Sequence, residues 1–96
     1  MGRRVILSPD ANEHIRSAIR WYVVQQLDLR VRFRADLRTT LRRVVRNPYQ
    51  FPLGEDQLRR ALMKRFPYTI YFRLNAEAVV VVGVLHQRQL SPWNTP

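Results

Sequence analysis

Apolar side chains recur at the three- and four-residue spacing of amphipathic helices in two stretches of the chain, residues 9–26 and 28–47. Ser8 can cap the first helix, and Pro9 suits its first position, where a missing N–H costs nothing. Pro48 stops the second helix. Because the link is so short, the two helices are expected to form an antiparallel hairpin. Their apolar faces consist of Ala11, Ile15, Ala18, Ile19, Tyr22 and Val23, and of Leu29, Phe33, Leu37, Leu41 and Val44.

Four shorter segments are rich in β-branched and aromatic residues and are predicted to be strands. They cover residues 3–8, 59–65, 68–74 and 78–86. A loop at residues 48–57 precedes the last three, which are joined by turns at residues 66–67 and 75–77 and are expected to form an antiparallel meander. The valines at residues 79–82 lack the alternation of a half-buried strand, which predicts a central strand covered on both faces.

The order of these elements is a strand, a helical hairpin and a three-stranded meander. This order predicts an α+β fold in which the hairpin packs on a small, mainly antiparallel sheet that the meander completes. A chain of 96 residues fits one domain and can bury a core without metal or disulfides. We therefore expect residues 1–96 to form a single domain.

The composition narrows the cellular setting. Cysteine is absent, which excludes disulfides, a thiolate nucleophile and a cysteine-based zinc site, and suits a reducing compartment. The apolar run near the start is shorter than a secretory signal needs, and the longest apolar stretch, residues 78–85, is too short to span a bilayer. The expectation is a soluble, cytoplasmic protein.

Charge is the most unusual property of the chain. Seventeen Lys and Arg residues against seven Asp and Glu residues give a formal net charge of +10, and all the basic residues except Lys64 are arginine. The planar guanidinium group has five donors that match phosphates and carboxylates. These features predict a polyanionic partner, either nucleic acid or an acidic protein segment.

One group of arginines follows the second helix, where Arg30, Arg34, Arg38, Arg42 and Arg46 recur every four residues. Like charges at this spacing destabilise a helix by roughly 0.2–0.5 kcal/mol per pair, and only Asp36 lies within the run to offset them. The run is either a solvated face or a docking face for an acidic partner. Trp21 lies off the apolar face of the first helix and is therefore expected to be exposed. An exposed tryptophan often marks a protein interface.

A second basic group comes from the predicted strands and the tail. It consists of Arg59, Arg60, Lys64, Arg65, Arg73 and Arg88. Because side chains alternate between the faces of a sheet, some of these must share a face, which predicts a basic concave patch. The alternative is that the charges protect edge strands from aggregation.

The sequence offers few groups for catalysis or metal binding. His14 and His86 are the only histidines, and neither has a nearby pair of carboxylates, so no metal site and no cofactor are expected. We interpret His14 as a surface residue. His86, two residues before Arg88, is the better candidate for a functional role such as general acid or base.

Three segments resemble the ParE/RelE superfamily of toxins from toxin–antitoxin systems. They are Val5-Ile6-Leu7-Ser8-Pro9-x-Ala11, the run Arg65-Phe66-Pro67-Tyr68-Thr69-Ile70-Tyr71-Phe72-Arg73, and Val84-Leu85-His86-Gln87-Arg88 followed by Trp93. The resemblance implies a bacterial cytosolic toxin that a cognate antitoxin neutralises by wrapping across its helices and sheet. It assigns antitoxin contacts to Trp21, Arg30, Arg34, Arg38 and Arg42.

The superfamily divides by target. Its RelE-like branch cleaves mRNA in the ribosome with basic strand residues and usually a tyrosine near the C-terminus, whereas its ParE-like branch inhibits DNA gyrase. Here Thr69 stands where the RNA-cleaving type tends to have arginine, and Trp93 is the only aromatic residue after Arg88. An indole cannot replace a phenol as acid or base. The resemblance therefore favours gyrase inhibition, with target contacts at Lys64, Arg65, Arg73, His86, Arg88 and Trp93.

Two alternatives stay open. The first is a ribosome-dependent mRNA endonuclease, because arginine can stabilise a phosphorane-like transition state. Its candidate catalytic residues are Arg65, Arg73, His86 and Arg88. The second is a general nucleic-acid-binding module, for which the affinity for any duplex falls steeply with salt.

Overall fold

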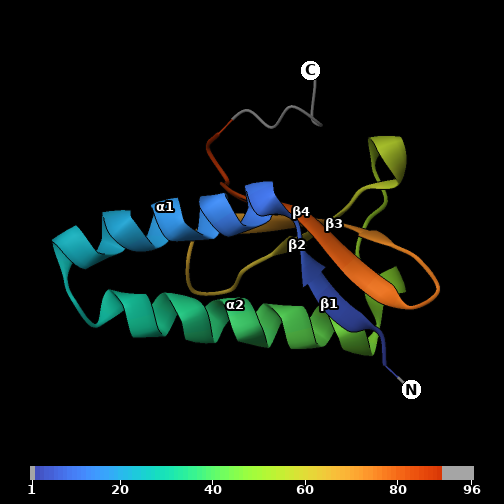
Figure 1. Ribbon diagram of the computed structural model, residues 1–96, viewed down its shortest axis with the longest axis horizontal. Helices are drawn as coiled ribbons and strands as arrows, with labels where there is room; N and C mark the ends of the chain where they lie inside the picture. Colours follow the sequence, from blue (N-terminus) through green and yellow to red (C-terminus); the bar gives the residue numbers. More distant parts are fainter. Residues whose placement is uncertain (1, 90–96) are drawn as a thin grey trace.

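A computed structural model of the chain describes residues 2–89 and has the α+β architecture expected from the sequence. Its elements are β1 (Arg4–Leu7), α1 (Pro9–Gln25), α2 (Leu29–Arg46), short 3₁₀ turns at Pro48–Gln50 and Glu55–Gln57, β2 (Arg59–Leu62), β3 (Tyr68–Leu74) and β4 (Ala78–His86). The four strands form one sheet in the order β1-β4-β3-β2. The predicted meander is confirmed, and β1 joins it as a parallel neighbour of β4 (Figure 1).

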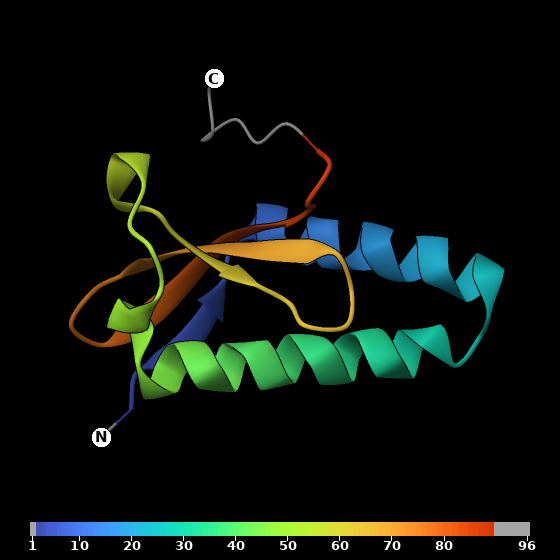
Figure 2. The same ribbon diagram turned by 180° about the vertical axis from the view of Figure 1, so that it is seen from behind.

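The two helices lie side by side, run in opposite directions and cover one face of the sheet (Figures 1 and 2). The core lies between the helices and this face. Phe33 of α2, Phe72 of β3 and Val79 and Val81 of β4 are fully buried there. The predicted apolar faces of both helices point into this core, except that Leu29 is not part of it. The amphipathic pattern of the two stretches is thus confirmed.

The start of α1 follows the expected capping chemistry. The Ser8 hydroxyl accepts a hydrogen bond from the Ala11 N–H at 3.0 Å, and Pro9 occupies the first helical position. Ser8 also extends the sheet, because its N–H donates to the Val81 carbonyl and its hydroxyl donates to the Val82 carbonyl. One residue therefore ends β1, begins α1 and ties both to β4.

His14 of α1 also bonds to the edge of β4, further along the strand than Ser8 does. Since β1 ends at Leu7, no strand within residues 2–89 pairs with this edge beyond Val81. There His14 Nδ1 accepts the Val84 N–H at 3.2 Å. The pairing with β3 shifts at the same place, where Val82 is an extra residue in β4. The half-buried His14 is thus a structural contact, and the interpretation of it as a surface residue is wrong.

The valine run in β4 is central, as predicted, but its two faces are not covered equally. Val79 and Val81 point into the main core and are fully buried. On the opposite face Val82 is half-buried and packs against a smaller cluster of Leu58, Tyr71 and Leu85. Along residues 2–89, neither α1 nor α2 is long and apolar enough to cross a membrane.

Candidate protein-interaction surfaces

The turn between β2 and β3 carries two of the residues that the sequence assigns to target binding. β2 ends at Leu62, so Lys64 and Arg65 lie in a turn rather than in the strand predicted for residues 59–65. Buried Asp36 of α2 explains the difference, since its Oδ2 accepts the N–H groups of Arg65 and Phe66 at 2.8 and 2.9 Å. These donors are therefore not available to extend the ladder of β2.

Asp36 therefore does not act as the sequence suggested. Instead of offsetting the arginines on the exposed face of α2, Asp36 is only 5% exposed and its carboxylate faces the turn. Phe66 also anchors the turn, with its ring centroid 4.9 Å from that of Tyr22 and 5.3 Å from that of Phe33. Lys64 and Arg65 are exposed on a turn whose backbone is held in place.

The end of β4 lies beside this turn. Tyr68 at the start of β3 pairs with His86 at the end of β4, and the Gln87 N–H donates to the Pro67 carbonyl at 2.8 Å. Lys64, Arg65 and Arg88 consequently share one end of the sheet, which we call the cationic end. Within residues 2–89 their side chains have no hydrogen bond and no ion pair.

His86 orders the backbone at the cationic end. Its Nδ1 accepts the Arg88 N–H at 3.0 Å, its N–H donates to Gln89 Oε1, and its ring packs edge-on against Tyr68 at 5.2 Å. Burial, and then the neighbouring Tyr22, raise the pKa of Tyr68 to about 12. The phenol nearest to His86 therefore keeps its proton at neutral pH.

Arg73, in contrast, lies away from the cationic end. It is five residues beyond Tyr68 in β3, which is about 17 Å along the strand at 3.3–3.4 Å per residue. Its Nε donates to the carbonyl of Asp56 at 2.9 Å. Of the other sequence-assigned target residues, Trp93 lies outside the described residues. The predicted basic patch is thus divided between two ends of the sheet.

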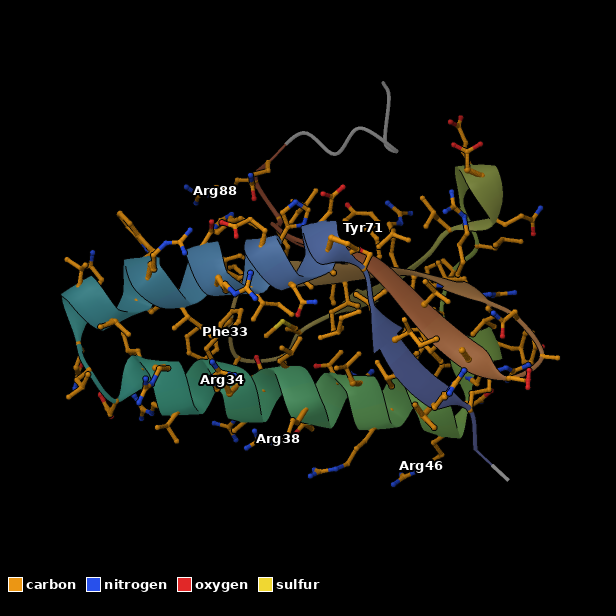
Figure 3. All side chains as sticks on the ribbon, in the orientation of Figure 1. Phe33, Arg34, Arg38, Arg46, Tyr71 and Arg88 are labelled. Atoms are coloured by element: carbon orange, nitrogen blue, oxygen red, sulfur yellow. The ribbon has the colours of Figure 1, made fainter. Side chains whose placement is uncertain are left out.

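The arginine row on α2 is exposed along its length. Arg30, Arg34, Arg38, Arg42 and Arg46 are all exposed. Within residues 2–89 the ion pairs join Glu13 to Arg16 and Arg20, so the row has no carboxylate partner there. Four residues span slightly more than one turn, so the row also winds around the helix. Figure 3 shows Arg38 and Arg46 pointing away from α1.

The second half of the row borders a groove beside β1, which we call the edge groove. Its lining consists of Val5, Arg38, Leu41, Arg42, Val45 and Arg46, and its volume is about 500 Å³. Val5, Leu41 and Val45 provide apolar surface, and the arginines provide a charged wall. β1 is an edge strand, because within residues 2–89 only β4 pairs with it. The groove therefore combines apolar contact, positive charge and an open strand edge.

A second groove, the turn groove, lies on another flank of α2, next to the anchored turn. It has a volume of about 770 Å³. Its lining consists of Leu29, Arg32, Ala35, Asp36, Thr39, Lys64, Arg65 and Phe66. Arg32 adds a third cation to Lys64 and Arg65. No local pattern marks Arg32, because α2 meets this turn only through the tertiary fold.

Large apolar side chains are exposed at the tip of the helical hairpin. Trp21 is 62% exposed, Val24 82%, Leu27 70% and Val31 62%. The two aromatic residues of the 48–57 loop differ from these: Phe51 is buried, and Tyr49, although exposed, packs under the guanidinium groups of Arg3 and Arg59. Leu27 and Val31 were not predicted as surface residues, but Val31 lies off the apolar face of its helix just as Trp21 does. Among residues 2–89 there is no group of three potential metal ligands.

Matches with known proteins agree with this architecture. The family model described as the ParE toxin of the type II toxin–antitoxin system parDE matches residues 5–91. The solved structure titled "Chromosomal ParDE TA system from P. aeruginosa" has a similar fold, with a TM-score of 0.74 and 13% sequence identity. The match covers 88% of this chain and 95% of that chain. No curated protein matches.

Proposed function

Since this chain belongs to the ParE toxin family, we propose that it inhibits DNA gyrase by direct binding and is neutralised by a cognate antitoxin. The observation that carries the first part is the cationic end. Lys64, Arg65 and Arg88 project from ordered backbone and have no partner within residues 2–89. Preorganised and unpaired cations of this kind suit an acidic surface on another macromolecule.

The geometry supports binding more than RNA cleavage. Of the four candidate catalytic residues, Arg65 lies in the turn before β3 and Arg73 near the far end of that strand, where it donates to the Asp56 carbonyl. Thr69, at the position where RNA-cleaving relatives tend to have arginine, is only 6% exposed. A nuclease needs its charged groups within reach of one phosphate. Arg65, His86 and Arg88 share the cationic end, but Arg73 lies away from them and is held by the Asp56 carbonyl.

A supercoiling assay with purified gyrase tests the proposal. Stoichiometric toxin should inhibit supercoiling and accumulate cleaved DNA complexes, and Arg88→Ala should weaken both effects about tenfold. Arg16→Ala, which removes an exposed arginine of α1, is the matched control. Absence of both effects with the wild-type protein rejects gyrase as the target. Codon-positioned cuts on programmed ribosomes would then favour the endonuclease, and steeply salt-dependent binding to any duplex would favour the nucleic-acid module.

For neutralisation we propose the edge groove as the antitoxin site. An acidic antitoxin segment with alternating apolar residues can pair with the open edge of β1, place apolar side chains on Leu41 and Val45, and meet Arg38 and Arg42. Arg46 extends this contact. Of the other antitoxin contacts expected from the sequence, Arg30 and Arg34 lie nearer the start of α2 and Trp21 lies near the end of α1.

Capture of the purified antitoxin tests this site separately from gyrase. Val45→Glu places a carboxylate in the apolar part of the groove and should weaken antitoxin binding at least tenfold. Val24→Glu makes the same substitution at the exposed hairpin tip and should leave binding unchanged. Equal binding of both variants would place the antitoxin elsewhere on the toxin.

A further inference from the structure

An uncharged row runs along α2 between its arginines. Val31, Ala35 and Thr39 recur every four residues and are exposed, and Leu27 in the preceding link continues the row toward the hairpin tip. Leu27 and Val31 are 70% and 62% exposed. Ala35 and Thr39 also line the turn groove. The row therefore joins the apolar hairpin tip to the turn groove as one continuous surface.

Cations border this row on both sides. Successive residues of a helix are about 100° apart, so Arg30 and Arg34 lie to one side of Val31 and Ala35, and Arg32 lies to the other. Across the turn groove Arg32 faces Lys64 and Arg65, whose position Asp36 maintains. An uncharged strip between two positive borders is the complement of a helix with an apolar stripe and acidic flanks.

We propose that this row is the part of the toxin that recognises its target, and that the partner segment is an acidic amphipathic helix on gyrase. The inference deepens the proposed function and rests on it. The small side chains of Ala35 and Thr39 let a second helix approach closely, so that its ridge packs beside theirs. The partner's carboxylates then meet Arg30 and Arg34 on one side and Lys64 and Arg65 on the other.

Other occupants fit this surface less well. A second copy of the chain also carries a net charge of +10, so two such surfaces repel each other. A DNA duplex gains from the cations but obtains nothing from Leu27 and Val31, because phosphate binding needs no apolar strip. The row is also distinct from the edge groove, which uses Leu41, Val45 and β1.

The decisive experiment compares the affinities of three proteins for purified gyrase. Val31→Glu places a like charge opposite the acidic partner and should weaken binding at least tenfold. Val24→Glu, at an exposed position outside the row, should change binding less than twofold. Both sites are solvent-exposed, so both variants should fold, which circular dichroism and antitoxin capture will verify. If wild-type toxin and Val31→Glu bind gyrase equally, the inference is overturned and the proposed function stands.

A synthetic probe separates failure of the inference from failure of the proposed function. The probe is a 20-residue helix with alanine and leucine on one stripe and glutamate on both flanks, and its control has the same composition in scrambled order. The surface is supported if the patterned peptide binds the wild-type toxin at least tenfold more tightly than the scrambled peptide and Val31→Glu abolishes this difference. This result would support the surface even if the wild-type toxin does not bind gyrase. Equal binding of the two peptides overturns it. So does a toxin dimer that Val31→Glu abolishes, or tight duplex binding that Val31→Glu abolishes.

Discussion

The basic residues at the two ends of the sheet differ in their contacts: in the described part of the chain, side chains at one end bond to the rest of the fold, and those at the other end do not. At the end where β3 meets the 75–77 turn, Arg3, Arg59 and Arg73 donate to the carbonyls of Asn75, Phe51 and Asp56. Arg3 and Arg59 also pack over the Tyr49 ring, 5.6 and 5.2 Å from its centroid. At the cationic end Lys64, Arg65 and Arg88 have no such contacts within residues 2–89. The same residue type holds the fold at one end and is free to bind at the other.

Net charge alone therefore does not locate a binding surface. Arg73 illustrates this point, because it contacts the carbonyl of Asp56, one of two neighbouring non-glycine residues with positive φ, 57° and 61°. Such backbone is strained and persists only when other contacts maintain it. Arg73 stabilises that turn, and an arginine with a structural partner contributes less to recognition than one without.

Removal of the Asp36 carboxylate should have the largest effect, because this carboxylate holds the backbone of the turn at the cationic end. Asp36→Leu leaves the N–H groups of Arg65 and Phe66 without their acceptor and should lower the free energy of unfolding by about 2–4 kcal/mol. Asp36→Asn retains an acceptor oxygen and should lose less. Urea denaturation measures both, and equal stability of all three proteins would contradict the role of Asp36.

Arg65→Ala should separate binding from stability. We expect gyrase inhibition to weaken about tenfold, which corresponds to about 1.4 kcal/mol, and the free energy of unfolding to change by less than about 0.5 kcal/mol. The reason is that the Arg65 side chain is exposed and has no partner within residues 2–89. Supercoiling titrations and urea curves on one preparation measure the two quantities. A loss of stability without loss of inhibition would reverse the comparison.

Arg59→Ala should show the opposite pattern at the other end of the sheet. It removes a hydrogen bond to the Phe51 carbonyl at 2.8 Å and the contact with Tyr49, so the free energy of unfolding should fall by about 1 kcal/mol. Gyrase inhibition per folded molecule should stay unchanged. An inhibition defect as large as that of Arg65→Ala would show that both ends bind the target.

The sequence anticipates those parts of the molecule that follow from neighbouring residues. The helices, the capping by Ser8 and the meander are all local patterns, and the structure confirms them. The end of β2 is different, because it depends on Asp36 taking the Arg65 N–H from a separate element. The single basic patch is a different case, because its prediction considers only which face of the sheet a side chain occupies. The bounds of β3, predicted as residues 68–74, already separate Arg65 from Arg73 by the length of the strand.

The smallest expected effect concerns the aromatic cluster beneath the cationic end. Burial raises the pKa of Tyr68 to about 12, above the value of about 10 for an unfolded chain. Its contribution to stability is therefore complete below pH 10 and is lost as the pH rises toward 12. Unfolding free energies between pH 9 and 12 should fall less steeply in Tyr68→Phe than in the wild-type protein. Parallel curves would contradict this.

The parallel pairing of β1 with β4 also sets an order of events during synthesis. Val5 pairs with Val79, so β1 has no partner until more than seventy further residues have been made. At 5–20 residues per second this delay is roughly 4–15 seconds. The strand edge and the groove beside it come into being only when the sheet is nearly complete. A neutralising segment that binds this edge would therefore bind the folded toxin and not the nascent chain.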